Sequence, residues 1–477
     1  MIVGIMNNLQ LFQQDIAGIA QTTDAQKVAA KSADYFWYSP ILKAELDGKV
    51  GDIVVSPRSD AEVLRVAAAC AKHRLKVTVR GGGTGNYGQC VPLEGGVILD
   101  LTGLDRVLDI GRGQVTCEAG ILIADLERAV RTSTVLPGGQ ELLMFPSTRD
   151  IATIGGFIAG GYAGAGSVRN GILKDAGNVT MVRVVTLEET PRVIELRGAD
   201  IQKVHHAYGT NGIITALTLA LKPAVDWVHQ IALFNSYGDA LRFGCAATEA
   251  IGQSVDAFLI TAVERRIAPY YAAEFGERFP ADRDAVFSMV HPQCLVQWRA
   301  LMCKHGGVES MALDEPALKR QKLFPAFECA YNHTTLMALK VDRSWTNLQT
   351  VHAWTPGVGI DIALVQKQME RWGDEVLMHH EFGRQFGPGG STQPEGTFCV
   401  AFGLPLVSFF DKERLYEIMR EFEADGCLVF DNHVVTIEGG GMKQIDTVQI
   451  EFKKVADPHG LMNPGKTSGW LPEYVQV

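Results

Sequence analysis

The sequence predicts an α+β fold divided into more than one domain. A chain of 477 residues is too long for a single hydrophobic core and corresponds to about two or three domains. Segments with the two-residue period of strands mix with segments of helical period, and strand-like segments flank two clusters of glycine. Hydrophobic residues make up 47% of the chain and charged residues 21%, which is typical of a folded globular protein.

The first glycine cluster lies in VRGGGTGNYGQ, residues 79–89, which contains the string G-x-G-x-x-G. In nicotinamide dinucleotide sites this string follows a strand and opens a helix. A helix over 61–73 and a strand over 75–79 are expected before it, but the next apolar strand, at 97–101, follows soon after Pro92. A crossover helix needs at least about 10 to 12 residues, and Pro92 breaks the few that are present. The sequence therefore predicts a tight loop between two strands, whose glycines let backbone N–H groups approach a phosphate. A flexible hairpin loop is the alternative.

The second glycine cluster, FPSTRDIATIGGFIAGGYAGAGSVRNG at 145–171, has seven glycines between Gly155 and Gly171. Apolar side chains interleave with these glycines, unlike in a polar Gly/Ser linker. Such a backbone can be buried against a flat or phosphorylated ligand. Strands are expected after it at 178–185 and, behind a Gly-Thr-Asn-Gly turn, at 213–217. Two glycine clusters and a third turn, each between strands, indicate one shared binding surface.

Charge, cysteine content and hydropathy exclude several classes of protein. The net charge of −10 and the lack of a basic run argue against nucleic acid as the main partner. The nine cysteines form no C-x-x-C pair, so neither a disulfide framework nor a cysteine zinc site is expected, and a reducing cytoplasm fits best. The N-terminal segment lacks the charged and long apolar regions of a signal peptide, and no window reaches about 18 apolar residues, the length of a membrane span. We expect a cytoplasmic protein without a transmembrane segment.

Several motifs follow one another in an order and spacing that match a known domain. They begin at VVSPRSDAEVLRVAAACAKHRLKVTVRGGGTG, continue through DL at 100–101, EAG at 118–120, LPGG at 136–139, TIGG at 153–156 and GTNGIIT at 209–215, and end in DPHGLMNPGKTSGW near the C-terminus. This pattern resembles the FAD-binding PCMH-type flavoprotein superfamily. The superfamily includes p-cresol methylhydroxylase, vanillyl-alcohol oxidase and the dehydrogenases of D-lactate, glycolate and D-2-hydroxyglutarate. The resemblance implies a two-subdomain FAD-binding fold and a substrate (cap) domain.

The resemblance also implies how FAD is held. The loop at 80–89 would hold the pyrophosphate, 146–167 would pass the isoalloxazine and adenosine, 212–214 would touch the adenine side, and the C-terminal tail would return to the flavin. No histidine stands in the loop after Arg80 or within 162–167, where relatives attach FAD covalently, so noncovalent FAD is expected. The expected FAD-binding residues are Arg80, Gly81, Gly82, Gly83, Thr84, Gly85, Asn86, Tyr87, Gly88, Gln89, Pro146, Ser147, Thr148, Thr153, Gly155, Gly156, Ala159, Gly160, Gly161, Gly166, Ser167, Gly212, Ile213, Ile214, Asn463 and Lys466.

The domain organisation follows from the C-terminal motif, because a tail that belongs to the first domain makes the middle of the chain an insertion. In the middle part, strand-like runs such as 228–234 mix with helix-like runs such as 412–422, which predicts an antiparallel sheet covered by helices. The expected boundaries are 1–225 for the FAD-binding domain, with its core at about 47–224, then 226–454 for the cap domain and 455–477 for the tail.

The leading candidate for catalysis is the stretch ECAYNHTTLMAL, residues 328–339. A flavin that accepts hydride from an alcohol carbon works with a nearby base, and often with a cation that orients a substrate carboxylate. On a strand, Tyr331, His333 and Thr335 would share one face, with Asn332 between them. Histidine is the natural base near neutral pH, so we expect His333 in this role. A structural histidine at a strand end is the alternative.

Two further stretches carry polar side chains. MHHEFGRQFGPGG, residues 378–390, offers two histidines, Glu381 and Arg384, although adjacent histidines usually point apart and a solvated helix end followed by a loop is the alternative. In DNHVVTIEGGG, residues 431–441, Asn432 and His433 precede Glu438. The full predicted catalytic set is His333, Tyr331, Asn332, His433 and Arg384.

The resemblance departs from the hydroxyacid dehydrogenases at their metal motif. Those relatives carry Glu-His-Gly where this chain has Glu438 followed by Gly439, and their upstream pair of histidines around Gly-Asp-Gly-Asn is missing here. Because a catalytic zinc needs three protein ligands, we expect no metal, and D-lactate and D-2-hydroxyglutarate become doubtful substrates. Arg169, Arg266 and Arg384 are candidate anion clamps, or else surface ion-pair residues.

Three functions remain open from the sequence. The first is an FAD-dependent oxidoreductase that takes a hydride from an alcohol or 2-hydroxy acid and passes electrons to a non-NAD acceptor, which would be oxygen, a quinone or an electron-transfer protein. The second is an oxidase of phenolic alcohols, in which Tyr270, Tyr271 or Tyr331 with Arg266 would deprotonate the phenol. The third is a flavin-binding electron-relay subunit without its own substrate. A homodimer is one option for the oligomeric state.

Overall fold

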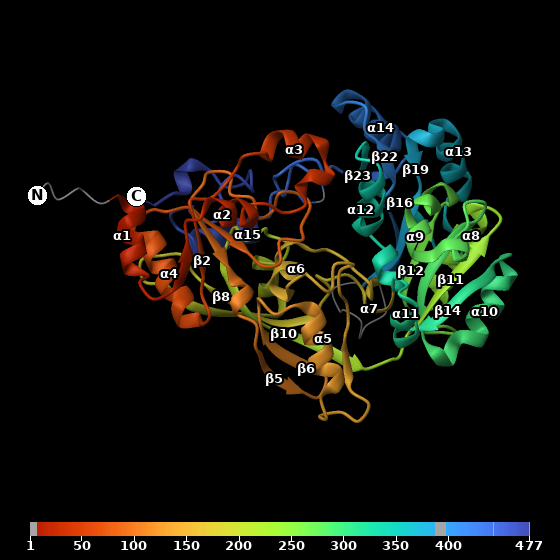
Figure 1. Ribbon diagram of the computed structural model, residues 1–477, viewed down its shortest axis with the longest axis horizontal. Helices are drawn as coiled ribbons and strands as arrows, with labels where there is room; N and C mark the ends of the chain where they lie inside the picture. Colours follow the sequence, from red (N-terminus) through yellow and green to blue (C-terminus); the bar gives the residue numbers. More distant parts are fainter. Residues whose placement is uncertain (1–6, 387–396, 442, 477) are drawn as a thin grey trace, which may run out of the picture.

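The computed structural model describes residues 7–386, 397–441 and 443–476. The first six residues of the expected FAD-binding domain and the end of the 378–390 stretch lie outside this range. Two bodies lie side by side, one containing the first half of the chain and both labelled ends, the other containing most of the second half (Figure 1). The largest buried apolar cluster includes Val182 and Leu217 from the first body and Phe287 from the second, so the core is continuous between them.

The first body begins with a four-stranded sheet in the order β1-β2-β4-β3, in which β2, β4 and β3 are parallel. The strands β3 and β4 are neighbours, yet the segment 81–96 between them contains no helix. This confirms that the first glycine cluster lies in a loop between strands and not in a Rossmann crossover. The elements are α1 (Asn8–Asp15), β1 (Ala20–Thr22), α2 (Ala25–Lys31), α3 (Pro40–Leu46), β2 (Ile53–Ser56), α4 (Asp60–Lys72), β3 (Val77–Arg80) and β4 (Val97–Asp100).

A second sheet of the first body has the order β5-β6-β10-β8-β9, with β7 paired to the far end of β10. The central strands β10 and β8 cover the strands expected at 213–217 and 178–185. The second glycine cluster forms two short helices and the loop between them. The elements are β5 (Val107–Gly111), β6 (Gln114–Glu118), α5 (Ile123–Thr132), β7 (Gln140–Leu142), α6 (Ile154–Gly160), α7 (Ser167–Asn170), β8 (Val179–Val185), β9 (Val193–Arg197) and β10 (Ile213–Pro223).

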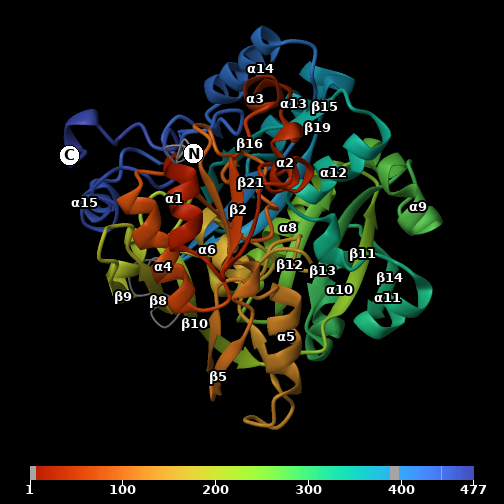
Figure 2. The same ribbon diagram turned by 60° about the vertical axis from the view of Figure 1, so that its left-hand side comes forward.

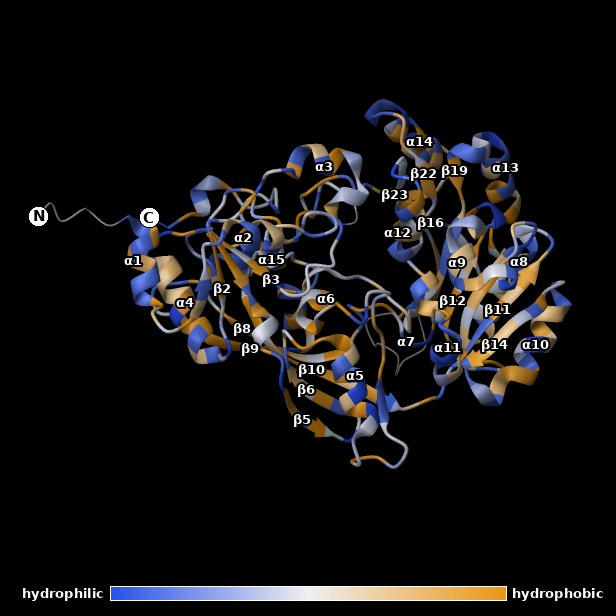
Figure 3. Cartoon of the chain, in the orientation of Figure 1, coloured by the Kyte–Doolittle hydropathy of each residue, from blue (hydrophilic) through white to orange (hydrophobic). Residues whose placement is uncertain are grey.

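The second body is built on an eight-stranded antiparallel sheet in the order β14-β11-β13-β12-β20-β21-β16-β23. Hydrophobic residues concentrate on strands such as β11 and β12, and the surrounding helices carry hydrophilic residues (Figure 3). The strands are β11 (Val228–Phe234), β12 (Ala257–Val263), β13 (Asp284–Val290), β14 (Val308–Asp314), β16 (Gln349–His352), β20 (His379–Gln385), β21 (Phe398–Gly403) and β23 (Leu428–Phe430). The helices are α8 (Tyr237–Ala250), α9 (Ala272–Phe275), α10 (Leu295–Lys304), α11 (Glu315–Gln321), α12 (Asn332–Val341), α13 (Ile362–Trp372) and α14 (Lys412–Ala424).

Two small sheets complete this body. One has the order β15-β22-β19 and the other pairs β17 with β18. Their strands are β15 (Trp345–Asn347), β17 (Trp354–Thr355), β18 (Gly359–Ile360), β19 (Val376–Leu377) and β22 (Leu406–Ser408). None of the helices in the described part of the chain is long and apolar enough to cross a bilayer.

The C-terminal segment returns to the first body. Helix α15 (Thr447–Ala456) lies beside β8 and β9, on the opposite side of the molecule from α9 and α11 (Figure 2). Gln449 Nε2 donates to the carbonyl of His205, Lys453 Nζ donates to that of Thr210, and Met462 forms a parallel bridge with Val77. These contacts begin with α15, slightly ahead of the expected start of the tail at 455. The strands divide between the bodies at 223–228, which supports the boundary near 225 that we propose.

Two of the expected local structures are wrong. The stretch 328–339 is not a strand but the 3-10 turn Ala326–Cys329 followed by α12, whose Met, Ala, Leu and Lys residues favour a helix. The stretch 378–390 begins not as a solvated helix end but as strand β20, in which the residues from His379 to Gly383 are all buried. A strand covered on both faces shows no alternation of polarity, so no strand pattern is visible in this stretch.

Candidate functional site

The main cavity lies where the glycine loops of the first body face the sheet and α12 of the second. Its space is about 1900 Å³ with the solvent at its mouth included. The wall of the first body consists of the loop after β3 and the segments 146–163 and 206–214. The opposite wall consists of residues from α12, β16, β21 and β23. The two glycine clusters and the third turn thus share one surface, as expected.

The glycines of the first loop are required by close packing. A Cβ on Gly81 would lie 2.0 Å from Thr153 Oγ1, one on Gly82 would lie 2.2 Å from the carbonyl oxygen of Ile151, and one on Gly83 would lie 2.0 Å from Arg80 Nη2. Distances this short do not occur between real side-chain atoms. At Gly81 and Gly82 the first loop therefore packs against the second cluster without a side chain of its own in between, which leaves its amides close to the cavity.

Unpaired buried donors lie beside this loop. Arg80 is 9% exposed, and its Nη1 donates to the carbonyls of Lys31 and Ala33, but its Nε has no partner. Asn86 is 7% exposed, and its Nδ2 also has no partner. Buried donors are normally satisfied, so unpaired ones on a cavity wall fit an acceptor-rich ligand such as a pyrophosphate.

Helix α12 is fixed to both walls through the residue that precedes it. Tyr331 has φ +53°, a left-handed conformation that is strained for a side chain of this size. Its backbone N–H donates to Glu381 Oε1 at 2.7 Å, and its hydroxyl donates to the carbonyl of Gly164 at 2.9 Å. These bonds set where α12 begins and how its first turn faces the second glycine cluster.

His333, in the first turn of α12, lines the cavity with a free ring nitrogen. Its Nδ1 is buried and has no hydrogen-bond partner. Burial lowers the pKa of His333 to about 4, because the charged imidazolium is poorly solvated there. The imidazole is consequently neutral near pH 7 and can accept a proton.

A neutral hydrogen-bonding cluster, formed by Tyr87, Asn332 and Gln349, lies on the same cavity. The amide nitrogens of Asn332 and Gln349 both donate to the Tyr87 hydroxyl oxygen, the first at 3.3 Å. Burial raises the pKa of Tyr87 to about 12, so the phenol keeps its proton at neutral pH. Since its oxygen already accepts two N–H groups, the Tyr87 O–H can serve as a donor to a bound molecule.

Most of the expected FAD-binding residues line this cavity, and six do not. Lys466 Nζ and Asn463 Nδ2 instead hold the first loop from behind, by donating to the carbonyls of Gly88 and Gln89. Gly166 is joined to the second body through a hydrogen bond from its N–H to Phe258. The six residues off the cavity wall are Gly88, Gly166, Ser167, Ile213, Asn463 and Lys466.

Two members of the predicted catalytic set lie away from the cavity. His433 is fully buried, and its Nδ1 lies 2.8 Å from Ser39 Oγ. Arg384 Nε and Nη2 donate to the carbonyls of Val168 and Arg169, so this guanidinium binds the backbone of α7. Asn432, which the sequence offered beside His433, donates to the carbonyl of Asn347.

The other candidate anion clamps form ion pairs. Arg169 Nε lies 2.9 Å from Asp256, and Arg266 Nε lies 2.6 Å from Glu264. Neither arginine lines the main cavity. The alternative of ion-pair residues therefore describes both. The partner of Arg169 is 87 positions away in the sequence, whereas that of Arg266 is only two residues away.

The adjacent histidines of β20 point apart, as expected. His379 Nε2 lies 2.7 Å from Glu381 Oε1, whereas His380 lies on the other face, 2.8 Å from the Tyr237 hydroxyl and 3.3 Å from His352. Among the described residues, no group of three or more His, Cys, Asp or Glu side chains could hold a metal ion. Glu438, the residue compared with the metal motif, accepts hydrogen bonds from Thr467 and Ser468 of the tail.

Several cavity residues escaped the sequence reasoning. Asp34, Tyr35 and Tyr38 line the cavity from the segment before α3. The aromatic run DYFWY at 34–38 is the feature of the sequence that could have indicated them. His206 and Tyr208 directly precede the third glycine turn. The strand residues on the second wall had no local signal, because their faces are set by the sheet. They are Gln349, Thr350, Phe402, Gly403, Leu404 and Phe430.

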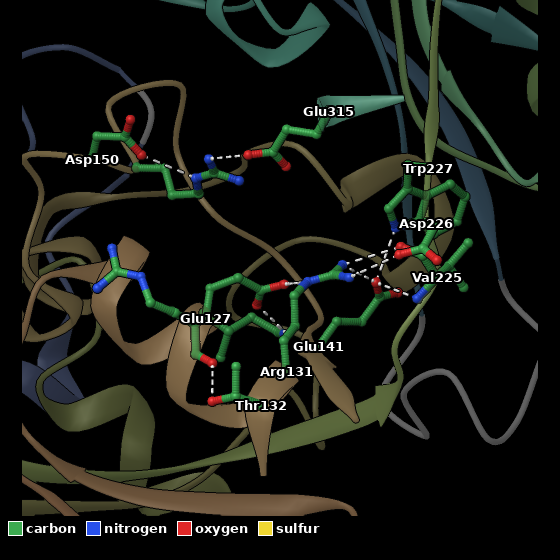
Figure 4. Close-up of polar contacts among 12 residues, drawn as sticks. Glu127, Arg131, Thr132, Glu141, Asp150, Val225, Asp226, Trp227 and Glu315 are labelled. Atoms are coloured by element: carbon green, nitrogen blue, oxygen red, sulfur yellow. Dashed lines mark hydrogen bonds and ion pairs between the residues drawn. The ribbon is translucent and has the colours of Figure 1, made fainter. Parts of the chain in front are cut away.

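A second cavity lies between α5, the strand junction at 225–227 and α11, and its polar groups satisfy one another. Arg131 binds Glu127 and Glu141, and Arg149 binds Asp150 and Glu315 (Figure 4). None of its described lining residues has a buried side-chain donor or acceptor without a partner. The main cavity, with unpaired groups on both walls, is therefore the candidate site.

Comparison with known proteins agrees with this site. The family described as an FAD binding domain matches residues 51–195. The D-lactate dehydrogenase of Anaerostipes hadrus is 30% identical over 187 residues, which are 36% of this chain and 37% of that protein. The mitochondrial D-lactate dehydrogenase (cytochrome) of Arabidopsis thaliana is 23% identical over 472 residues, 91% of this chain and 76% of that protein.

The fold is shared with solved structures at low identity. Alkyldihydroxyacetonephosphate synthase has a TM-score of 0.69 at 15% identity, with 95% of this chain and 84% of that chain covered. The chain spans only 26% to 37% of the length of the first curated relatives that it matches. The family match at 51–195 contains both glycine clusters.

Proposed function

The chain carries an FAD-binding domain of the PCMH-type flavoprotein superfamily, and we propose on this basis that the protein is an FAD-dependent oxidoreductase. Its substrate would be an alcohol or a 2-hydroxy acid, and the electrons would pass to an acceptor other than NAD. The observation that supports this most is His333, a neutral histidine with a free Nδ1, on the wall opposite the glycine loops.

The residues of the first wall fit FAD. Arg80 and Asn86, with unpaired buried donors, and the backbone amides of the glycine loop would bind the pyrophosphate. The flat surface of the second cluster, where glycines bring the backbone to the cavity, suits an aromatic ring system. When bound, FAD supplies a hydride acceptor. We propose noncovalent binding, in which acid denaturation releases all the flavin into the supernatant.

The second wall would supply the base. As the C–H bond of the substrate breaks, the hydroxyl proton must leave, and a neutral imidazole at the cavity surface is suited to take it. His333 Nδ1 would accept this proton. The first turn of α12, held by Tyr331 and Glu381, would keep the imidazole in place.

The two alternatives have less support. In a phenol oxidase of the expected kind, a tyrosine and Arg266 would share the site, but Arg266 pairs with Glu264 and the Tyr271 hydroxyl lies 3.0 Å from Thr334 Oγ1. Neither Arg266 nor Tyr271 lines the main cavity. An electron-relay subunit has no use for an unpaired histidine on a cavity wall, whereas a substrate-oxidising enzyme does.

The test follows the visible spectrum of the purified protein during anaerobic addition of alcohols and 2-hydroxy acids. Bleaching of the flavin by a member of these classes is expected. The variant His333→Ala should retain FAD and reduce it at least about 100-fold more slowly, since general bases contribute ~10²–10⁴-fold. The rate of the native protein should decline only as pH falls toward about 4, where His333 becomes protonated and can no longer accept a proton.

His305→Ala is the matched control. This histidine also belongs to the second body and its pKa is also lowered by burial, but it does not line the main cavity. Its replacement should leave flavin reduction unchanged. Equal reduction rates in native protein and His333→Ala would remove His333 from the mechanism, and a protein that neither carries nor binds flavin would overturn the proposal.

A further inference from the structure

The charged groups of the main cavity are few and lie on one side. Arg80 is the one lysine or arginine among its described lining residues, and Asp34 is the one carboxylic acid. Both belong to the first body, and Arg80 lies in the loop that would hold the pyrophosphate. The second wall is formed by neutral groups. They are Tyr331 at the start of α12, the amides of Asn332 and Gln349, Thr350, and apolar and aromatic side chains.

The histidines of the cavity do not add positive charge. Burial lowers the pKa values of His206 and His333 to about 4, so both are neutral near pH 7. Burial raises the pKa of Asp34 to about 6, so near pH 7 this group is ionised and repels an anion. Asp34 lies near Arg80 and Lys466, whose positive charges lower its pKa, and the described groups that line the cavity beyond the pyrophosphate loop are neutral.

The three arginines considered as anion clamps, and Lys174, do not supply the missing cation. The guanidinium of Arg384 is held by backbone carbonyls, and those of Arg169 and Arg266 by carboxylates. Lys174 stacks over the Tyr162 ring, 5.7 Å from its centre, without lining the cavity. The segments outside the described residues, 1–6, 387–396, 442 and 477, contain no lysine, arginine or histidine.

We propose that the substrate is an uncharged alcohol and not a 2-hydroxy acid. This inference rests on the proposed oxidoreductase function and narrows its substrate class. A carboxylate taken out of water needs a counter-charge, because an unpaired buried charge is strongly unfavourable. The cavity offers the substrate the neutral Tyr87–Asn332–Gln349 cluster and aromatic side chains, which suit a neutral polar molecule with an apolar part.

The reaction balances without further groups from the protein. The hydroxyl proton passes to His333 Nδ1, the hydrogen of the carbinol carbon passes with its electron pair to FAD, and the alcohol becomes a carbonyl compound. An electron acceptor, as the second substrate, then has to take two electrons from the reduced protein. No step requires a cation at the substrate.

The first measurement compares matched pairs that differ only in charge. Mandelate is compared with methyl mandelate, and lactate with methyl lactate, both enantiomers of each, by anaerobic stopped-flow reduction of the FAD-loaded protein. The ester of at least one pair should reduce the flavin at least about 100-fold more efficiently than its acid. Binding is measured without turnover by titrating the oxidised protein with benzoylformate and with methyl benzoylformate, and only the ester should shift the flavin absorption.

A positive charge introduced into the second wall tests whether a cation there would allow the cavity to accept a carboxylate. Leu336 lines the cavity on α12, and Val341, at the end of the same helix, is 69% exposed. Leu336→Arg should raise the efficiency of the acids relative to the esters at least about tenfold. Val341→Arg, which adds the same charge outside the cavity, should leave this ratio unchanged.

The outcomes separate the two proposals. Acids that reduce the flavin as well as their esters would overturn the neutral-substrate inference and leave the oxidoreductase function intact. Flavin that dithionite reduces, but that no alcohol, ester or acid reduces, would overturn the proposed function and with it this inference. A preference for esters in the native protein that is lost in Leu336→Arg but kept in Val341→Arg supports both.

Discussion

Gly83 and Gly138 adopt the same left-handed backbone conformation, with φ +67° and +86°, in very different surroundings. A Cβ on Gly83 would meet the Arg80 guanidinium at 2.0 Å, whereas nothing lies within 4 Å of a Cβ on Gly138. At the scale of single residues, Gly83 is therefore required both because no Cβ fits there and because its φ is positive. Gly138 is required only because its φ is positive.

This pair gives a test of the pyrophosphate loop. Gly83→Ala and Gly138→Ala should each lose about 1 kcal/mol of unfolding free energy through backbone strain. Only Gly83→Ala should also displace Arg80 and weaken FAD binding, by at least about tenfold if one charge-assisted hydrogen bond of ~1.5–3 kcal/mol is lost. Fluorescence titration of the apoproteins with FAD measures this. Equal FAD affinities in the two variants would show that Arg80 does not need its observed position.

At the scale of elements, α12 depends on one buried carboxyl group. Glu381 is fully buried and accepts hydrogen bonds from the Tyr331 N–H, from Thr261 Oγ1 and from His379 Nε2. It thereby connects β20 and β12 to the residue before α12. We interpret Glu381 as a positioning residue, which acts on the site through the first turn of that helix.

Its replacement should affect both stability and the site. Glu381→Leu leaves three buried polar groups without a partner and should lower the unfolding free energy by about 3–5 kcal/mol, while Glu381→Gln, which keeps an acceptor, should lose about 1–3 kcal/mol. Glu309→Gln, which removes an exposed pair with Arg299, should lose at most about 1 kcal/mol. Denaturant unfolding gives these values. Partial rescue of flavin reduction by Gln over Leu is expected, and identical rates in both would argue against a positioning role.

At the scale of the whole molecule, the C-terminal tail connects the end of the chain to the first glycine loop. The Asn463 N–H donates to the carbonyl of Val77 in β3, and the Val77 N–H donates to that of Leu461. The Asn463 side chain donates to the carbonyls of Gln89 and Tyr208, and Lys466 donates to that of Gly88. The loop is thus held from behind by residues more than 370 positions away in the sequence.

Two truncations test this dependence. A chain that ends after Gly460 loses these bonds and should bind FAD about 100-fold more weakly, since the three side-chain hydrogen bonds of Asn463 and Lys466 contribute ~1 kcal/mol each. A chain that ends after Trp470 retains them and should bind FAD normally. Circular dichroism checks that both fold. Full FAD affinity in the shorter chain would show that the tail does not organise the loop.

The α+β class, the two glycine loops and the resemblance to FAD-binding flavoproteins could all be predicted from the sequence, because a glycine required where no Cβ fits is visible in the sequence itself. The sequence also singled out His333, although it assigned that residue to a strand. The folded structure was needed to show that His333 faces the cavity from a helix, that His433 and Arg384 do not line it, and that the described residues of the second wall include no lysine or arginine. The physical reason is that these properties depend on partners distant in sequence, such as Glu381 for Tyr331 and the α7 carbonyls for Arg384. Because both faces of β20 are buried, its sequence likewise lacks the alternation of polar and apolar residues that predicts a strand.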